Sequence, residues 1–414
     1  SCLLCKKSII SMYSDKDTAP VCCNECWNGD KRDQYEYAKD YDFTKTFFEQ
    51  LKELFDVNPR IYLYRIGNIV NSDYTNYTVD NKNCYLAYSV IVCEDVFYSE
   101  NIDKSKNTLD SLNVEKLDGC SYNIDCENNF NTHYAIKSQS CVDCSFVFDC
   151  TNCSNCFLSS NLRNQQYVFK NKKYTREEYV NKIEEYKLNT YSGWIKAIDS
   201  FDLMVKNTAI HKYAFIIASQ NTSGDYILNS KNIKNSFVVR ESENIKYGFR
   251  ALMNVKDSYD LSGVGLNVEL CYDSAMTSKN VYKDFFCYMT IEGSRECEYS
   301  LILKNCSNCF GCVGLNNAQY CIFNKQYTKE EYEELLPKVK QHMMNMPYID
   351  NAGRIYKYGE FFPFDMCPFG YNEASAGEYF LISKDEAKEK GYKWIEKEKK
   401  DYTPTINSQD LQDN

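Results

Sequence analysis

The chain has 414 residues, a formal net charge of −10 and a pI near 5.1. This length is enough for two or three domains with a large buried core. The acidic balance argues against a protein whose main task is to grip phosphate backbones, because that task needs clustered Lys and Arg. No apolar run approaches the roughly 18 residues of a membrane span, so no membrane partner is expected.

The 22 cysteines indicate the compartment. Small secreted domains use cysteine densely because their cores are too small, and a chain of this length does not need such help. Many of the cysteines also stand at C-x-x-C spacing, which suits a tetrahedral metal better than a disulfide framework. We therefore expect an intracellular, cytoplasmic setting. The chain begins at Ser1 rather than at Met, which suggests a fragment of a longer protein.

The first predicted element is a zinc ribbon over residues 1–35. Cys2-x-x-Cys5 and Cys23-x-x-Cys26 together have the spacing C-x2-C-x17-C-x2-C, which is typical of zinc sites. Two such pairs place four thiolates at the corners of a tetrahedron and leave no open position, so the expected zinc is structural. The adjacent Cys22 makes the third ligand ambiguous, but Cys23 keeps the spacing.

A helical linker is expected over residues 36–66. Between residues 43 and 56, Phe and Leu side chains recur at helical spacing, and Pro59 follows the end of the pattern. The apolar face of this predicted helix holds Phe43, Phe47, Phe48, Leu51, Leu54 and Phe55.

The chain then contains a long internal repeat. The motif Asn-Cys-Ser-Asn-Cys-Phe at residues 152–157 returns at 305–310, and 17 of 28 positions are identical between 152–179 and 305–332. Such self-similarity at a fixed offset indicates a repeat architecture. It divides the body into two halves, 67–190 and 191–346, followed by a C-terminal segment over 347–414.

A shorter repeat lies within the halves. Residues 232–237, 244–249, 254–259 and 280–285 share the pattern Asn, apolar, polar, polar, small or polar, aromatic, and looser copies occur at 83–85, 95–97, 119–122 and 141–146. Short strands punctuated by Asn and Asp are typical of a parallel β-helix, a solenoid, with the right-handed winding of parallel crossovers. We expect coils in the low to middle twenties of residues, built on period-two strands. A leucine-rich horseshoe and a β-propeller fit less well. The expected inward positions are Ile233, Phe237, Ile245, Phe249, Val255, Tyr259, Val281, Phe285, Cys306 and Phe310.

Each half is expected to close with a capping helix. Thr175 with Glu178 and Thr328 with Glu331 form capping boxes that open amphipathic stretches reaching about Lys187 and Met346. A further short helix is predicted from Ser383 to about Gly391. The full prediction is a mainly β fold with capping α-helices and an N-terminal zinc ribbon.

The remaining cysteines cluster within the repeats and allow three interpretations. Ser236, Gly248 and Ser258 occupy equivalent places in sister repeats, which favours small, buried core residues. Additional zinc and an iron–sulfur or redox role are the alternatives. The possible second metal site draws on Cys141, Cys144, Cys153, Cys156, Cys306, Cys309 and Cys312, with Cys150 nearby.

No catalytic residue can be assigned. His133, His211 and His342 have no catalytic partner nearby in the sequence, and no phosphate-binding glycine motif is present. Carbohydrate-active β-helices use carboxylates along a groove. Candidates for such a face are Asp95, Asp143, Asp257, Asp260 and Asp284, although Asp is also the ordinary corner residue of this repeat.

Several of these motifs occur together in one known family. They are the ribbon, residues 9–14, residues 81–85, the doubled Asn-Cys-x-Asn-Cys-Phe…Tyr-Thr-x-Glu-Glu-Tyr, and residues 356–363. The chain resembles the uncharacterised zinc-ribbon, Cys-rich repeat proteins of small-genome bacteria and large DNA viruses. Members often carry a CoA-transferase label, which nothing in these residues supports. The resemblance implies the repeat fold, and virion association if the protein is viral, but no activity.

Three functions are therefore open. The favoured one is a non-enzymatic, zinc-stabilised scaffold that binds a macromolecular partner, preferably a protein. The alternatives are a carbohydrate-active β-helix enzyme and a nucleic-acid-associated zinc-ribbon protein, the latter using Lys31 and Arg32 just beyond Cys26.

Overall fold

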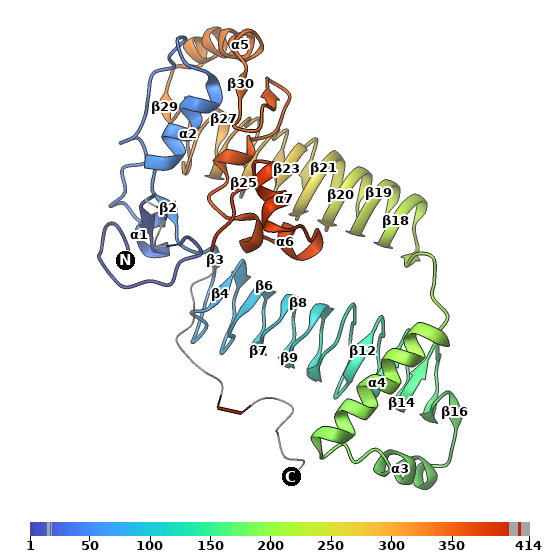
Figure 1. Ribbon diagram of the computed structural model, residues 1–414. Helices are drawn as coiled ribbons and strands as arrows, with labels where there is room; N and C mark the ends of the chain where they lie inside the picture. The colour runs from blue at the N-terminus through green and yellow to red at the C-terminus, as the bar shows by residue number, and fades with distance from the viewer. Residues whose placement is uncertain (15–16, 18, 397–404, 407–414) are drawn as a thin grey trace. The chain divides into compact units, whose positions relative to one another are not determined.

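The computed structural model describes residues 1–14, 17, 19–396 and 405–406 (Figure 1). Strand takes up 36% of the chain and helix 19%, so the prediction of a mainly β protein with parallel sheets is confirmed. The chain forms two compact units. Among the described residues, unit 1 comprises 1–9, 13–14, 17, 19–61 and 212–396, and unit 2 comprises 10–12, 62–211 and 405–406. Of the predicted C-terminal segment 347–414, residues 397–404 and 407–414 lie outside the described residues.

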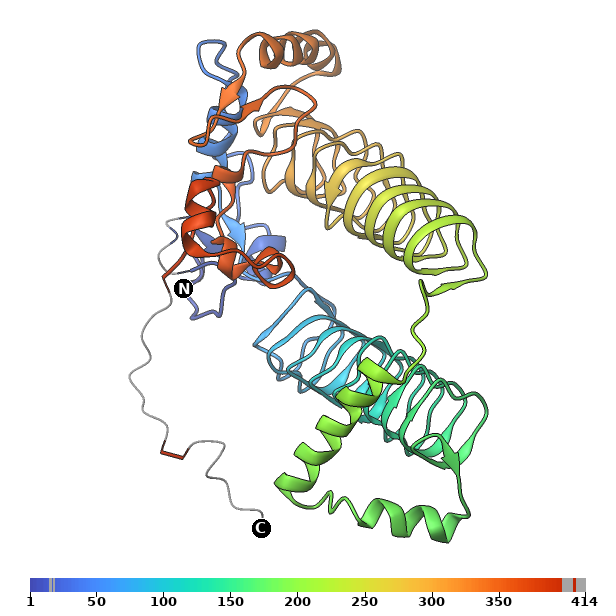
Figure 2. The same ribbon diagram turned by 45° about the vertical axis from the view of Figure 1, so that its right-hand side comes forward.

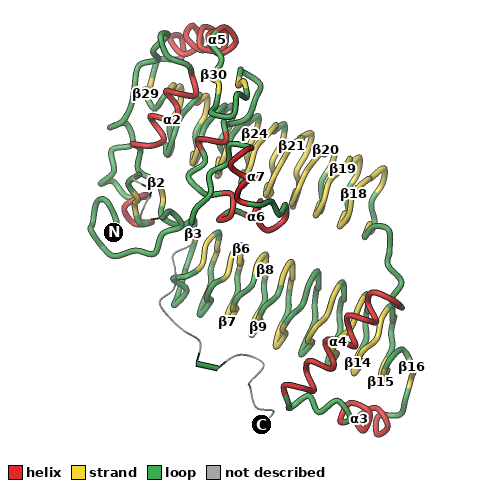
Figure 3. The backbone as a smooth tube through the Cα atoms, in the orientation of Figure 1, coloured by secondary structure: helices red, strands yellow, loops and turns green. Residues whose placement is uncertain are grey.

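Unit 2 is a ladder of short strands arranged in two sheets (Figure 3). The six-stranded sheet contains β3 (Arg65–Ile66), β4 (Thr75–Asn76), β5 (Thr78–Val79), β6 (Ala87–Ile91), β8 (Glu100–Asp103) and β10 (Leu112–Glu115). The eight-stranded sheet contains β7 (Glu94–Phe97), β9 (Lys106–Leu109), β11 (Asp118–Ser121), β12 (His133–Ile136), β13 (Ser145–Phe148), β14 (Ser154–Ser160), β15 (Gln166–Phe169) and β16 (Lys172–Lys173). The pairs are parallel except β15–β16, which closes the ladder as an antiparallel hairpin.

The backbone of unit 2 repeats every 12 residues and has a local period of three. Lys106 pairs with Asp118, and His133 pairs with Ser145. From Tyr77 to Lys170 every third residue has a positive φ, in the left-handed region that non-glycine residues seldom adopt. One residue in three is correspondingly buried. The expectations of period-two strands and coils of more than twenty residues are therefore wrong. One residue with left-handed backbone follows every two residues with extended backbone. Every third side chain therefore points into the interior of the ladder.

Small side chains fill the interior of unit 2 and complete its hydrogen bonds. The backbone N–H of Ser111 donates to Oγ of Ser99 at 3.1 Å, and the N–H of Asn123 donates to Oγ of Ser111 at 3.2 Å. Each of these bonds joins equivalent inward positions of consecutive turns. Ser, Asn and Cys are found inside because their side chains hydrogen-bond the backbone N–H and C=O groups that have no partner in the strand pairing.

Unit 1 contains the second ladder, whose successive backbone turns are clearest in Figure 2. Its ten-stranded sheet contains β17 (Ile216–Ile217), β18 (Gln220–Leu228), β19 (Lys231–Arg240), β20 (Glu243–Leu252), β21 (Val255–Gly265), β22 (Val268–Glu269), β23 (Tyr272–Ala275), β24 (Val281–Tyr282), β25 (Tyr288–Ile291) and β26 (Leu301–Lys304). Parallel β27 (Ser307–Phe310) and β28 (Gln319–Ile322) follow, and β29 (Lys325–Gln326) pairs antiparallel with β28.

Several turns of unit 1 are one residue longer than those of unit 2, as in the pairs Tyr259–Tyr272 and Tyr272–Phe285. The extra residue occupies a second, consecutive left-handed position, as at Met253–Asn254, Leu266–Asn267 and Lys279–Asn280. The second member of each of these pairs is Asn. Its amide joins a ladder in which Asn254 donates to Asn267 at 2.7 Å and Asn267 donates to Asn280 at 2.8 Å. The ladder therefore stabilises the inserted residues.

The inward positions predicted for unit 1 are partly confirmed. Six of the ten are buried: Ile233, Ile245, Val255, Val281, Cys306 and Phe310. Phe237, Phe249 and Tyr259 are instead 52%, 41% and 44% exposed, and Phe285 is half-buried. The prediction was wrong for these aromatics because the residue before each one, such as Ser236, Ser258 or Asp284, takes the inward place.

The capping helices begin as predicted. Thr175 opens α3 (Arg176–Glu184) and Thr328 opens α5 (Lys329–Asn345), each with a complete capping box. Ser383 caps α7 (Lys384–Glu389). The helix predicted over 43–56 is α2 (Phe47–Val57), and Phe43 lies outside it and is exposed.

One long helix was not predicted. It is α4 (Tyr191–Asn207), which begins just after the predicted boundary at residue 190 and packs against β13 and β14 of unit 2. Trp194 lies 5.6 Å from the ring of Tyr134 and 5.5 Å from that of Phe146.

The other elements of unit 1 are short. They are β1 (Val21–Cys22), α1 (Asn24–Asn28), β2 (Arg60–Ile61), β30 (Tyr348–Ile349), β31 (Ile355–Tyr356), α6 (Ser375–Tyr379) and the 3-10 turns Phe364–Met366 and Tyr371–Glu373.

Candidate metal centre

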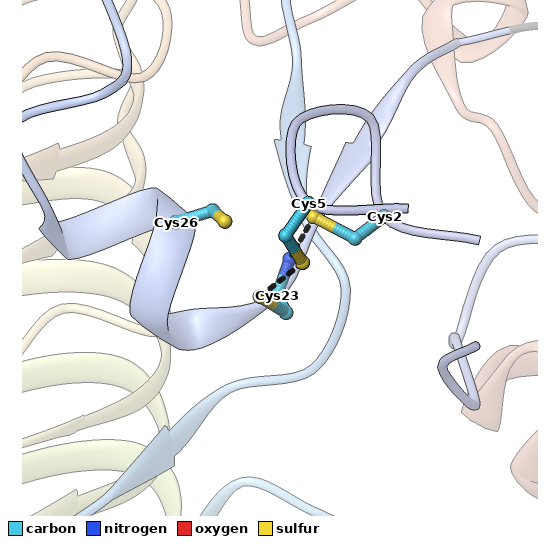
Figure 4. A group of neighbouring side chains, drawn as sticks. All are labelled: Cys2, Cys5, Cys23 and Cys26. Atoms are coloured by element: carbon cyan, nitrogen blue, oxygen red, sulfur yellow. Dashed lines mark hydrogen bonds between the residues drawn. The ribbon is translucent and has the colours of Figure 1, made fainter. Parts of the chain in front are cut away.

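Cys2, Cys5, Cys23 and Cys26 come together at the amino-terminal end of unit 1 (Figure 4). Cys2 and Cys5 lie on a tight turn, in which the N–H of Lys6 donates to the carbonyl of Cys2 and Lys6 adopts a positive φ. Cys23 is the N-cap of α1, and Cys26 lies within that helix. The sequence thus brings one pair together by a turn and the other by the first turn of a helix.

The four sulfur atoms lie within 4.8 Å of one another. Sγ of Cys5 and Sγ of Cys23 are 3.8 Å apart. Sulfurs at the corners of a tetrahedron with Zn–S bonds of about 2.3 Å are separated by about 3.8 Å, so the spacing fits such an ion. Cys2, Cys23 and Cys26 are buried and Cys5 is exposed. This set can therefore hold a metal ion, and all four residues are those predicted.

The electrostatics of the set favour one thiolate before any metal binds. Burial raises the pKa of the Cys2 thiol, but hydrogen bonds from the backbone N–H groups of Cys23, Cys5 and Leu4 lower it to about 6. Desolvation raises the pKa of Cys23, and it raises that of Cys26 to about 12 together with the neighbouring thiols. A bound dication would reverse these last two effects, because metal coordination displaces thiol protons.

The neighbouring Cys22 takes no part in this set. It is buried, and desolvation raises the pKa of its thiol to about 11. Cys23, which keeps the x-x spacing, is the one that lies with Cys2, Cys5 and Cys26.

Arg32 is used within unit 1. Its guanidinium lies 4.0 Å above the ring of Trp27, and Nη1 donates to the carbonyl of Gly314 at 2.7 Å. Gln34 adds a second link, since its Oε1 accepts from the N–H of Asn316 at 2.7 Å. These bonds fasten the cysteine-bearing segment to the last turns of the ladder.

The cysteines of the suggested second metal site lie inside the two ladders. They are Cys141, Cys144, Cys153 and Cys156 in unit 2, and Cys306, Cys309 and Cys312 in unit 1, all buried. The thiol of Cys141 donates to the carbonyl of Gln139 at 3.4 Å, and that of Cys306 to the carbonyl of Lys304 at 3.3 Å. Within the described residues, the Cys2–Cys26 set is the one group of three or more His, Cys, Asp or Glu side chains placed to hold a metal ion. The interpretation as small core residues, which bond backbone carbonyls, fits these contacts best.

The three histidines contact different residues, and the suggested carboxylates have different surroundings. Nδ1 of His133 lies 2.7 Å from Oγ of Ser121, Nδ1 of His342 lies 2.8 Å from the hydroxyl of Tyr41, and Nε2 of His211 lies 2.7 Å from the carbonyl of Val205. Asp95, Asp143 and Asp257 each accept a ladder hydrogen bond from an Asn of the preceding turn. Asp260 lies near other acids, since burial and the charges of Asp260 and Glu360 raise the pKa of Asp273 to about 6. Asp284 is buried inside the ladder, and burial raises the pKa of its carboxyl to about 7.

Sequence reasoning missed two features. The first is the fully buried Arg60, which pairs with Asp17 at 2.9 Å and lies 3.9 Å above the ring of Phe55. The second is a groove on unit 2 formed by side chains at equivalent positions of successive turns. The period of these turns was the signal that would have revealed this groove.

No protein-family profile matches the chain, and no curated protein matches it. The resemblance to the Cys-rich repeat proteins therefore remains a hypothesis. Among the described residues, no helix is long and apolar enough to cross a membrane.

Proposed function

We propose that the protein is a zinc-stabilised, non-enzymatic scaffold that binds a macromolecular partner, most simply another protein. We further infer that each ladder is a right-handed β-helix. The observation that carries the proposal is a four-thiol set fastened by Arg32 and Gln34 to the end of a repeating parallel ladder. A four-thiol site has no open coordination position, so its role is to stabilise.

Zinc is the metal that best fits this donor set. It favours tetrahedral thiolate coordination and is bound through C-x-x-C pairs, and a segment of about thirty residues has too small a core to fold unaided. The stacked turns add long outer faces on which side chains repeat at constant spacing. Such surfaces suit binding of an extended or helical partner.

Two observations weigh against the alternatives. A nucleic-acid role for the ribbon would use Lys31 and Arg32, but Arg32 is engaged with Trp27 and Gly314. A carbohydrate-active site would bring an acid and a base within about 10 Å of each other. Asp95, Asp143 and Asp257 are instead engaged by Asn side chains of their ladders.

The test is in-cell cross-linking in the native source, followed by affinity purification of the whole chain and identification of the adducts. The proposal predicts a recurrent protein adduct at stoichiometric yield. Recovery of nucleic acid or glycan alone, or turnover of a polysaccharide by the purified chain, would contradict it.

A further inference from the structure

A groove of about 770 Å³ runs along one face of unit 2. Its walls include Tyr74, Leu86 and Tyr98, which are 50%, 51% and 53% exposed. Leu112 and Ile124 add aliphatic surface on an adjoining face. Large apolar side chains exposed together in this way mark an interaction surface more often than a solvated one.

The groove is continuous with a surface that already holds a helix. Leu86, Tyr98, Tyr122, Tyr134 and Phe146 occupy equivalent positions of the repeating turns, all with positive φ. The rings of Tyr122 and Tyr134 stack at 4.5 Å, and those of Tyr134 and Phe146 at 4.8 Å.

The helix α4 covers only part of this column. Trp194 lies over Tyr134 and Phe146, and Phe201 lies 6.0 Å from Phe146. Tyr122, one turn earlier, is 42% exposed, and Tyr98 and Leu86 lie beyond it. The packing of α4 shows that this column of side chains accepts the aromatic side of an amphipathic helix. The side chains of the earlier turns in the same column, Leu86 and Tyr98, are exposed.

The charges in the groove are acidic. Asp73, Glu100 and Asp110 are among its lining residues, and none of the lining residues in the described part of the chain is Lys or Arg. Asp110 stands in the same column as Leu86 and Tyr98, so a carboxylate interrupts the apolar surface. Complementary charge on an occupant would be positive.

The aromatic geometry favours a helix over a glycan. Sugar-binding surfaces offer flat ring faces with several fixed polar groups. Here Tyr74 packs edge-on against Tyr85 at an interplanar angle of 65°, and Tyr85 packs against Tyr98 at 88°. The rings interlock with one another, and aliphatic side chains fill the surface between them.

We propose that this groove docks a basic amphipathic helix of a partner protein, with its apolar side on Leu86 and Tyr98 and its Lys or Arg side chains against Glu100 and Asp110. This assignment rests on the scaffold function proposed above. It specifies the class of partner that the scaffold binds and the surface to which that partner binds. The occupant extends the row of helix contacts that α4 begins.

The probe for the test is a fluorescein-labelled peptide of about 18 residues, long enough for five helical turns, with Leu and Trp at helical positions i, i+3, i+4 and i+7 and Lys elsewhere. Fluorescence anisotropy is measured with the full chain and two variants, Leu86→Lys and Val92→Lys. The two sites form a matched pair, because they lie six residues apart, are 51% and 50% exposed, and both have positive φ. Val92 lies outside the groove.

The proposal predicts saturable binding that Leu86→Lys weakens by about tenfold or more and Val92→Lys leaves unchanged. A peptide with Glu in place of Lys is expected to bind about tenfold more weakly than the Lys peptide. Equal binding by the two variants, or no saturable binding of the Lys peptide, would overturn the assignment. Binding of a neutral oligosaccharide that Leu86→Lys abolishes would assign the groove to glycans instead.

The Leu86→Lys chain is also used in the cross-linking experiment, which separates this inference from the function on which it rests. Loss of the adduct in this variant, with its retention in Val92→Lys, supports the groove. An adduct retained in both variants leaves the scaffold function standing and contradicts the groove. Absence of any adduct with the unaltered chain contradicts the scaffold function itself.

Discussion

Oδ1 of Asp284 accepts a hydrogen bond of 3.1 Å from the backbone N–H of Cys297, 13 residues further along the chain. The carboxyl group is fully buried among the inward residues of unit 1, where the sister positions hold Ser and Cys. Burial raises the pKa of this carboxyl, and the hydrogen bond from the N–H of Cys297 partly offsets the rise. The resulting pKa is about 7. Below about pH 7 the buried carboxyl is therefore chiefly neutral.

The first prediction concerns the pH dependence of stability. The folded-state pKa of Asp284 lies above its unfolded value. Its contribution to the free energy of unfolding is therefore fully present below about pH 4 and is lost as the pH rises through about 7. Asp284→Asn keeps an oxygen for the N–H of Cys297 and cannot ionise. At pH 8 the variant is expected to be more stable than the native chain by up to about 4 kcal/mol, with the advantage vanishing near pH 4. The measurement is urea unfolding at both pH values; a variant that is destabilised equally at both would refute the account.

The second prediction concerns the inserted residues of unit 1. Asn267 accepts from Asn254, donates to Asn280 and has a φ of 63°. Asn267→Ala removes both ladder bonds and places a Cβ-bearing residue without a polar side chain in the left-handed region. We expect a loss of about 2 kcal/mol.

Asn267→Gly is the control for this prediction, since it removes the same hydrogen bonds without backbone strain. The Gly variant should lose less free energy of unfolding, relative to the native chain, than the Ala variant. Thermal unfolding of the three chains side by side provides the comparison, and a Gly variant less stable than the Ala variant would show that strain is not involved.

The third prediction concerns the buried cysteines. Cys141→Ser and Cys153→Ser place in the core of unit 2 a hydroxyl that can make the same bond to the carbonyl two residues earlier, as Ser99 and Ser111 already do. The double variant is expected to fold with a modest loss of stability and to carry as much metal as the native chain. Loss of a metal equivalent on this double substitution would instead assign a second metal site to the core.

The parts of the fold that could be predicted are those in which local chemistry determines the outcome. The capping boxes at Thr175 and Thr328 specify helix starts through bonds three residues apart, and both helices begin there. The C-x-x-C pairs likewise predicted the four thiols that come together in the candidate metal centre, because a turn and a helix start each bring two thiols together locally.

The period of the ladder could not be predicted in this way. Leu86, Val92 and Tyr98 occupy left-handed positions that such side chains disfavour on their own. They are held there by hydrogen bonds to the neighbouring turns, such as that from the N–H of Val92 to the carbonyl of Val79 at 2.8 Å. The groove was missed for the same reason, since its column of side chains exists only once the length of the turn is known.

The most direct test of the central claim is the metal content of the anaerobically purified chain, combined with X-ray absorption at the edge of the bound metal. The account predicts one zinc per chain with four sulfur neighbours at about 2.3 Å. Cys26→Ser should lose this zinc and unfold the segment before α2, while the ladder of unit 2 keeps its β signal because it has a core of its own. A chain without zinc, or a zinc with nitrogen or oxygen neighbours that Cys26→Ser leaves in place, would contradict it.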